Sequence, residues 1–140
     1  METGFVRKPR QHFDTAPRPQ HVTFDDGRGQ RRNFPWMRYA EARWDYDMEP
    51  DVIHVLIADW LVVIRGHNLG PLYLALEDQV LTRLCAQPKF EKESERMIDS
   101  FATEIRFARP VEAAAKRKGQ AELDLGAGLA AKARLRKNAP

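Results

Sequence analysis

The sequence predicts an α+β fold, a mostly antiparallel sheet of four to five strands with one main helix packed on one face. Two observations predict it. Between residues 21 and 65, apolar residues alternate with polar ones or gather in short β-branched runs bounded by turn residues. After residue 65, the apolar positions 69, 72, 73, 76, 80 and 84 recur at helical spacing.

The first predicted strands surround a turn of small polar residues. Residues 21–24 form a short β-type run, and residues 25–29 contain glycines that tolerate a positive φ. Residues 31–39 continue as an extended segment, in which Pro35 cannot donate a ladder hydrogen bond and so indicates an edge or a bulge. Residues 38–47 then alternate strictly, which is typical of a strand with one buried and one solvated face.

The centre of the predicted sheet is a hairpin of two apolar runs. Residues 52–57 and 60–65 are separated only by Ala58 and Asp59. Because both runs are apolar on both faces, we expect both faces of the sheet to be covered. One helix covers one face, so the other needs the final segment of the chain or a second copy. Since the homodimer is the commonest closed symmetric assembly, the sequence predicts self-association.

The main helix is expected over about residues 69–86. Asn68 is a suitable N-cap, Gly70 with Pro71 is an equally acceptable start, and Pro88 closes the other end. The apolar residues of segment 97–109 fit both a helix and a strand. Their β-branched and aromatic content favours a strand over 101–108.

Composition and charge divide the chain into three parts: a flexible basic N-terminal tail (1–20), the folded domain (21–110), and a basic C-terminal tail (111–140) rich in Ala, Gly, Lys and Arg. The formal net charge is +3. Residues 33–110 hold nine basic and thirteen acidic side chains, whereas residues 111–140 hold seven basic and three acidic ones. The basic character therefore belongs to the ends of the chain.

Composition also argues against a membrane span and a cysteine-based metal site. The longest apolar run, residues 55–64, is far shorter than the roughly 18 residues that a span requires. Cys85 is the only cysteine, and the four histidines lack ligand spacing, so we expect no disulfide and no metal. The first 20 residues contain no apolar stretch typical of a secretory signal, and we expect a cytoplasmic protein.

The turn before the predicted helix is a candidate anion site. Arg65, His67 and Asn68 precede the helix N-terminus, whose free amide groups favour a phosphate or carboxylate. The simpler interpretation, which we prefer, is that Asn68 caps the helix and Arg65 is a solvated strand residue. There is no phosphate-binding loop and no nucleophile elbow, so we expect no catalytic residues and no cofactor.

Nucleic-acid binding is a candidate because basic and aromatic residues interleave before residue 40. Bases stack on such rings while arginine neutralises phosphate. The candidate residues are Arg31, Arg32, Phe34, Trp36 and Arg38. The C-terminal tail adds Lys116, Arg117, Lys118, Lys132, Arg134, Arg136 and Lys137. These tail residues are suited to salt-sensitive phosphate contacts or, alternatively, to keeping the chain soluble.

The sequence therefore predicts a small, non-enzymatic, cytoplasmic accessory module. It would self-associate through a sheet face and contact an acidic partner, above all nucleic acid, through its basic ends. Two alternatives remain open. One is a protein-binding module without a nucleic-acid role. The other, less favoured, is an enzyme with an anion site around Arg65, His67 and Asn68.

Overall fold

A computed structural model of the chain describes residues 8–47, 50–93 and 97–109. The chain divides into a unit of residues 1–107 and a unit of residues 108–140, most of which lies outside the described residues. The expected C-terminal tail, 111–140, with its seven candidate cations, lies there too. The described elements are eight strands in two sheets, one α-helix and two short 3-10 helices, which confirms the α+β class.

The first sheet has the strand order β1-β7-β2-β3. Its strands are β1 (Phe13–Thr15), β7 (Leu81–Cys85), β2 (His21–Asp25) and β3 (Arg31–Pro35). Strands β2 and β3 form an antiparallel hairpin, as expected from the turn residues between them. Strand β7 is antiparallel to β1 but parallel to β2, so this sheet is mixed.

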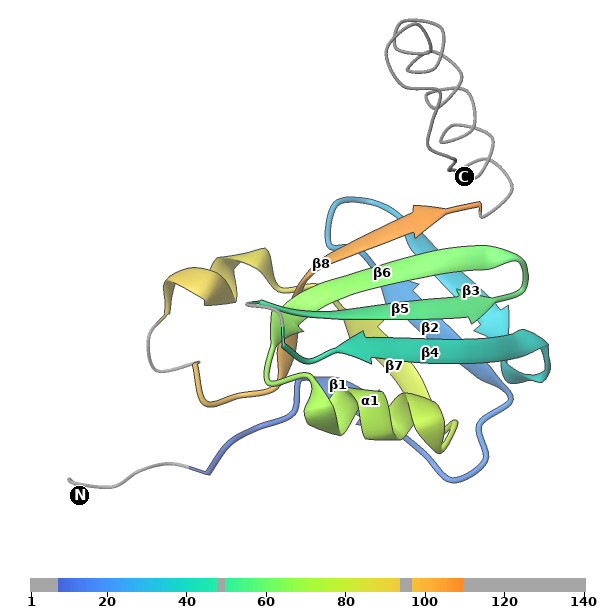
Figure 1. Ribbon diagram of the computed structural model, residues 1–140, viewed down its shortest axis with the longest axis horizontal. Helices are drawn as coiled ribbons and strands as arrows, with labels where there is room; N and C mark the ends of the chain where they lie inside the picture. Colours follow the sequence, from blue (N-terminus) through green and yellow to red (C-terminus); the bar gives the residue numbers. More distant parts are fainter. Residues whose placement is uncertain (1–7, 48–49, 94–96, 110–140) are drawn as a thin grey trace, which may run out of the picture. The chain divides into compact units, whose positions relative to one another are not determined.

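The second sheet has the order β4-β5-β6-β8. Its strands are β4 (Tyr39–Asp45), β5 (Asp51–Ile57), β6 (Trp60–His67) and β8 (Phe101–Ala108). The pairs β4–β5 and β5–β6 are antiparallel. Strand β8 lies beside β6, and the two run in opposite directions in Figure 1. The two apolar runs form the expected hairpin, and the strand expected over 101–108 is confirmed.

The two sheets pack face to face, with the second sheet in front of the first in Figure 1. Their inner faces supply the core. The fully buried core residues of the central strands include Val22, Phe24, Ile53, Val55, Val62 and Ile64. The single core that the chain can support is therefore made by sheet against sheet, as in other two-layer folds.

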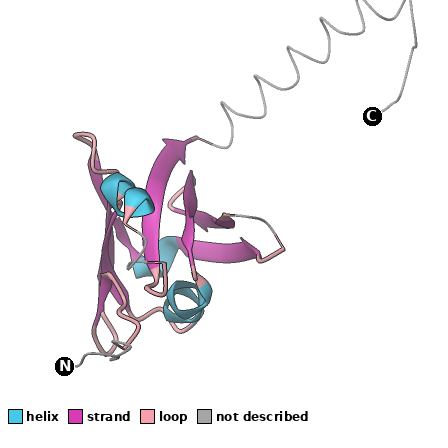
Figure 2. Ribbon diagram, turned by 90° about the vertical axis from the view of Figure 1, so that its left-hand side faces the viewer, coloured by secondary structure: helices cyan, strands magenta, loops and turns pink. Residues whose placement is uncertain are grey.

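Helix α1 (Gly70–Glu77) fills the gap between the two sheets along one side. It contacts β4 of the second sheet and β7 of the first, and Figure 2 shows it end-on at the bottom of the two layers. Leu72 and Leu76 are fully buried there. The expectation that the helix lies on one face of a single sheet is thus wrong, because the chain forms a second sheet that occupies this face.

The helix is also shorter than the expected range of about 69–86. It ends at Glu77, and Gln79 then adopts a positive φ of 55°, which turns the chain into β7. Leu81 and Leu84, which had extended the helical pattern, are fully buried strand residues. Short apolar runs fit both periods, and pairing with β1 and β2 decides in favour of the strand.

The expected flexible N-terminal tail, residues 1–20, is partly incorporated into the fold, because β1 lies within it. The backbone N–H of His12 donates to the carbonyl of Ser100 over 2.9 Å, and the N–H of Ser100 donates to the carbonyl of Arg10 over 2.8 Å. These contacts join the segment before β1 to the start of β8. Such long-range pairing leaves no local sequence pattern.

The remaining helical elements are 3-10 turns at Trp36–Arg38 (η1) and Pro88–Lys92 (η2). Among the described residues, no helix combines the length and the apolar character needed to cross a membrane.

Candidate interaction surface

The outer side of the second sheet carries an apolar strip on its two central strands. Its members, named here the outer apolar face, are Val52, His54, Leu56, Leu61 and Val63. In the ladder, Leu56 pairs with Leu61 and His54 pairs with Val63. Val52 is buried and the other four are half-buried. Figure 1 looks onto this face, and no other described element lies over it.

Charged side chains of both signs flank the outer apolar face. On the β4 side, Glu41 pairs in register with Leu56, Arg43 with His54 and Asp45 with Val52. On the other side, Arg65 lies 3.6 Å from Glu104, which also pairs with Arg106 of the same strand. An apolar centre with a polar, mixed-charge border is the composition of a protein–protein interface.

The surroundings of His54 disfavour its charged form, although a carboxylate oxygen of Asp45 lies 3.7 Å from Nδ1 of the ring. A side-chain N–H of Arg43 lies 3.2 Å from Nδ1 of His54. Because arginine is always a donor, Nδ1 accepts and the ring proton is on Nε2. Burial, and secondly the charge of Arg43, lower the pKa of His54, while Asp45 acts in the opposite direction. With the ring proton on Nε2, His54 presents an N–H donor within the apolar strip.

The proposed anion-site residues do not converge on one point. The side chain of Arg65 pairs with Glu104 on the outer side of the sheet. Asn68 directs its side-chain amide to the carbonyls of Met97, at 2.8 Å, and Asp99, at 2.9 Å. Nε2 of His67 lies 3.8 Å from a carboxylate oxygen of Glu91.

The helix N-terminus already has a carboxylate partner. The backbone N–H of Leu69 donates to Asp51 over 3.0 Å. Asn68 makes no side-chain cap, so the expected capping role is wrong as well; Asn68 instead takes a positive φ of 54°. Asp51, His67 and Asn68 line a shallow depression of about 450 Å³, so a carboxylate already borders the expected anion site. A second negative charge is disfavoured beside it.

The proposed nucleic-acid residues do not form a stacking surface. Phe34 and Trp36 are buried core residues, and Nε1 of Trp36 donates to the carbonyl of Leu81 over 3.0 Å. Their rings are therefore closed to bases. Alternation along β3 directs Phe34 into the core and Arg31 and Asn33 to solvent, while Arg32 lies on the same face as Phe34. A run that is contiguous in the sequence is therefore divided between the two faces of the sheet.

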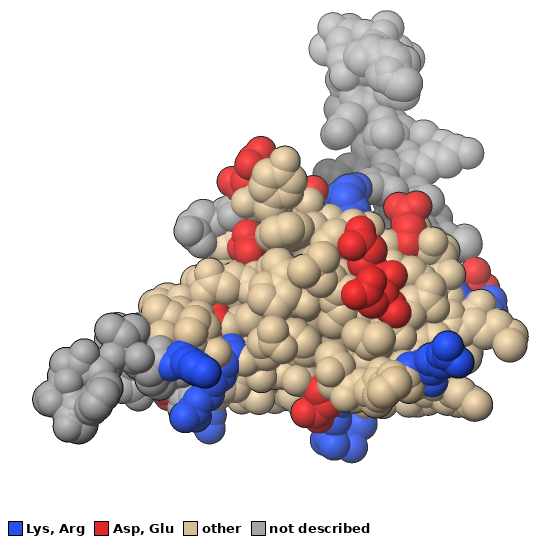
Figure 3. Space-filling view, turned by 90° about the horizontal axis from the view of Figure 1, so that it is seen from below, with Lys and Arg blue, Asp and Glu red and all other residues tan. Residues whose placement is uncertain are grey.

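The three arginines of this segment have partners within the protein. Arg31 lies 3.1 Å from Asp25, and Arg38 lies 2.9 Å from Asp59. The guanidinium of Arg32 stacks on the ring of Trp60, 3.8 Å from its centroid. Figure 3 shows acidic and basic groups in separate small clusters over the face in view. This view shows no continuous basic surface.

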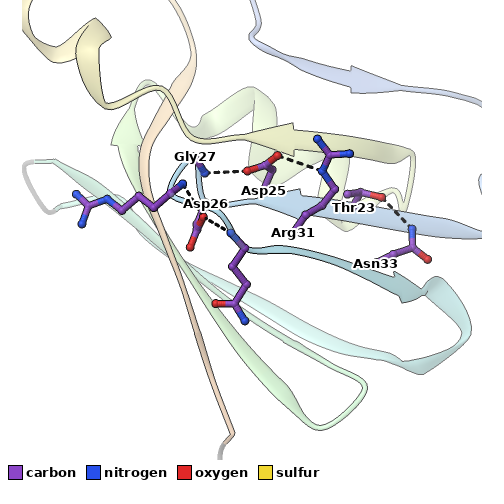
Figure 4. Close-up of polar contacts among 8 residues, drawn as sticks. Thr23, Asp25, Asp26, Gly27, Arg31 and Asn33 are labelled. Atoms are coloured by element: carbon purple, nitrogen blue, oxygen red, sulfur yellow. Dashed lines mark hydrogen bonds and ion pairs between the residues drawn. The ribbon is translucent and has the colours of Figure 1, made fainter.

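The turn between β2 and β3 uses its carboxylates to hold its own backbone (Figure 4). Asp25 accepts from the N–H of Gly27 over 2.8 Å. Asp26 accepts from the N–H groups of Arg28, at 2.7 Å, and Gln30, at 3.0 Å. Gly27 has a φ of 73° and closely approaches the carbonyl of Ala86, so these acidic residues stabilise a tight turn.

A buried Asp–His pair, which sequence reasoning missed, anchors the N-terminal segment. Asp99 is fully buried and accepts from Nε2 of His12 over 2.8 Å and from the backbone N–H of Arg10 over 3.0 Å. The ring of His12 packs edge-on against Phe90 and Phe101. Residues so distant in the sequence leave no motif, so only the tertiary structure reveals this pair.

Within the described ranges, no group of three or more His, Cys, Asp or Glu side chains is arranged to hold a metal ion. Comparisons of the chain with protein-family models, with curated proteins and with solved structures found no match. The site must therefore be interpreted from its own chemistry.

Proposed function

We propose that this protein is a small, non-enzymatic accessory module that binds another polypeptide through the outer apolar face. The observation that supports this most directly is the half-buried strip of His54, Leu56, Leu61 and Val63, which no other described element covers. Strands β5 and β6, which carry these side chains, are each paired with a neighbouring strand on both sides and so hold the side chains in fixed positions. A partner that covers them gains roughly 25 cal/mol for each Å² of apolar surface removed from water.

The charges around the strip favour a polypeptide with charges of both signs. Arg43 and Asp45 lie on one side, and Arg65, Glu104 and Arg106 lie on the other. A nucleic acid presents only negative charge, and its binding depends on unpaired cations. A polypeptide with an apolar centre and mixed charges is complementary to this pattern.

The nucleic-acid role rests on the C-terminal cations, which lie outside the described residues. Deletion of residues 116–140 is expected to weaken binding to a single-stranded oligonucleotide and to make the remaining binding less dependent on salt. Binding titrations at two salt concentrations would measure this. An unchanged affinity and an unchanged salt slope would remove nucleic acid from the proposal.

The engagement of the titratable groups near the candidate sites supports a non-catalytic role. Asp99 binds His12, Asp51 binds the helix N-terminus, and Asp25 and Asp26 stabilise a turn. Asp51 also lines a depression, but its carboxylate already accepts from the N–H of Leu69, whereas a catalytic group must be able to contact a substrate.

The proposal is tested by placing a charge at the centre of the strip. Leu61→Lys should abolish the retention of partner polypeptides by the immobilised full chain, as measured by quantitative mass spectrometry. Thr23→Lys, on the outer side of the first sheet, is the matched control and should retain them. Retained complexes should also survive nuclease. Equal retention by both variants, or loss of every complex after nuclease treatment, would contradict the proposal.

A further inference from the structure

Strand β8 is the longest edge strand among the described elements. It has eight residues, whereas the edges of the first sheet, β1 and β3, have three and five, and β3 ends at Pro35. The opposite edge of the second sheet, β4, packs against α1. A long edge strand presents a row of unpaired backbone groups that another strand can bind.

The free backbone groups of β8 can be assigned from one hydrogen bond. The backbone N–H of Gln87 donates to the carbonyl of Ala102 over 2.7 Å, from the side of β8 away from β6. Alternate residues of a strand direct their backbone groups to the same side. Glu104 and Arg106 therefore also direct their N–H and C=O groups to the free edge. No backbone partner outside the sheet ladder is seen for these groups among the described residues.

The space along this edge is open. A depression of about 310 Å³ lies between the β2–β3 turn and the segment 104–107 of β8. Asp26, Arg28 and Gln30 line its other side. The backbone of Gln87 occupies the edge at Ala102, so a strand placed in this depression would pair with the second half of β8, residues 104–107.

The sequence of β8 is complementary to itself in antiparallel pairing. Glu104 and Arg106 lie on either side of Ile105 and point to the same, outer side of the sheet. When Ile105 is placed opposite Ile105 of a second copy, Glu104 of each chain lies opposite Arg106 of the other. Opposite charges directly across from each other stabilise an antiparallel pair.

We infer that two copies of this chain pair antiparallel through β8, about a two-fold axis at Ile105. The backbone groups of Glu104 and Arg106 form the new ladder, and their side chains form symmetric ion pairs. The two second sheets become one continuous sheet of eight strands, and the two outer apolar faces lie side by side. This pairing does not depend on the proposed function, because it uses the edge of the sheet and leaves its face free.

The inference is tested first by charge exchange in the full chain, with the dimer dissociation constant measured by sedimentation equilibrium. Glu104→Arg alone and Arg106→Glu alone should each raise this constant roughly tenfold or more, because like charges then face each other. The double exchange, Glu104→Arg with Arg106→Glu, should restore it. A wild-type chain that stays monomeric, or a double variant that dimerises no better than the single variants, would overturn the inference.

A second test removes the edge donor itself. Arg106→Pro deletes an N–H that faces away from β6, a position where proline is tolerated in edge strands, and should weaken dimerisation by about a hundredfold. Arg106→Ala keeps the N–H and should have a smaller effect. Circular dichroism checks that each variant is folded. If the proline variant is misfolded, the charge-exchange variants of Glu104 and Arg106 provide the test.

A matched control separates the edge from the face. Leu61→Lys lies on the outer apolar face and should leave the edge dimer intact, as should Arg43→Glu on the opposite edge strand. If Leu61→Lys abolishes dimerisation while Arg106→Pro does not, self-association runs through the face and the edge pairing is wrong. Loss of partner retention in Leu61→Lys with an intact dimer would support both proposals independently.

Discussion

The outer sides of the two sheets differ in chemistry, although their inner sides share one core. On the first sheet, the outward residues of β2 and β3 are polar apart from Pro35, and they include Thr23, Asp25, Arg31 and Asn33. On the second sheet, the outward residues of the central hairpin are apolar apart from His54 and Arg65. A two-layer fold needs apolar residues only on the inner sides. The outward apolar residues of the second sheet are therefore not needed for the core, which supports the proposed binding surface.

The largest effect should come from breaking the second sheet where two of its strands meet most closely. A Cβ at Gly66 would lie 2.1 Å from the carbonyl oxygen of Phe101. Gly66→Ala should therefore destabilise the protein by more than about 3 kcal/mol, measured by urea unfolding. Gly29→Ala is the control: a Cβ there would meet nothing within 4 Å, and only its φ of 112° causes strain. A similar loss in both variants would contradict the close approach.

Adjacent residues on β6 separate the inner from the outer side. Ile64 is fully buried in the core, whereas Val63 is half-buried on the outer apolar face. We expect Ile64→Ala to cost about 2–5 kcal/mol of unfolding free energy. Val63→Ala should cost under about 1 kcal/mol. Equal costs in denaturant titrations would mean that the outer side is covered as well as the inner one.

The two outer sides should also respond to acid at different pH values. On the second sheet, the pKa of His54 in the folded protein is below its ordinary value of 6.5. As the pH decreases, His54 is therefore protonated at a higher pH in the unfolded chain than in the folded protein. The unfolding free energy falls as the pH decreases from about 6.5 through the lowered pKa. His54→Gln should flatten the wild-type decrease in this interval, measured as unfolding free energy against pH. If the unfolding free energy of the variant decreases by the same amount, the wild-type decrease comes from another titratable group.

The smallest effect is expected on the polar side of the first sheet. The hydrogen bond from the N–H of Gly27 and the neighbouring Arg31 lower the pKa of Asp25 below 3.8. An acid with a lowered pKa in the folded state contributes stability above about pH 3.8, which is lost as the pH falls through the lowered value. Asp25→Asn keeps the turn acceptor but removes the charge, so it should slightly flatten the stability profile below pH 4. A change confined to the pH range above 5 would argue against this assignment.

The sequence predicted those elements that depend on neighbouring residues and missed those that depend on contacts between distant parts of the chain. The hairpin β5–β6 and the strand β4 follow from local alternation and from turns, and they were predicted. Strand β7 was assigned to the helix because Leu81 and Leu84 fit both periods. Strand β1 was assigned to a tail because its pairing with β7 joins segments distant in the sequence.

The candidate sites also differ in whether local sequence or distant contacts determine them. The basic-aromatic segment was interpreted as one surface, although the alternation of β3 buries Phe34 and Trp36. The apolar character of both sides of the central hairpin was recognised, together with its need for cover. The inner side is covered by another part of the same chain, and in the described residues the outer side remains open.

The sequence by itself determined the α+β class, the strands between residues 21 and 65 and the excess of apolar residues on the central hairpin, because these depend on local periodicity and on turns. Only the tertiary structure decided that the chain forms two sheets, that α1 lies between them and that Asp51 and Asp99 bind within the fold. These features depend on contacts between distant residues, which compete for the same buried space and leave no pattern in the linear sequence.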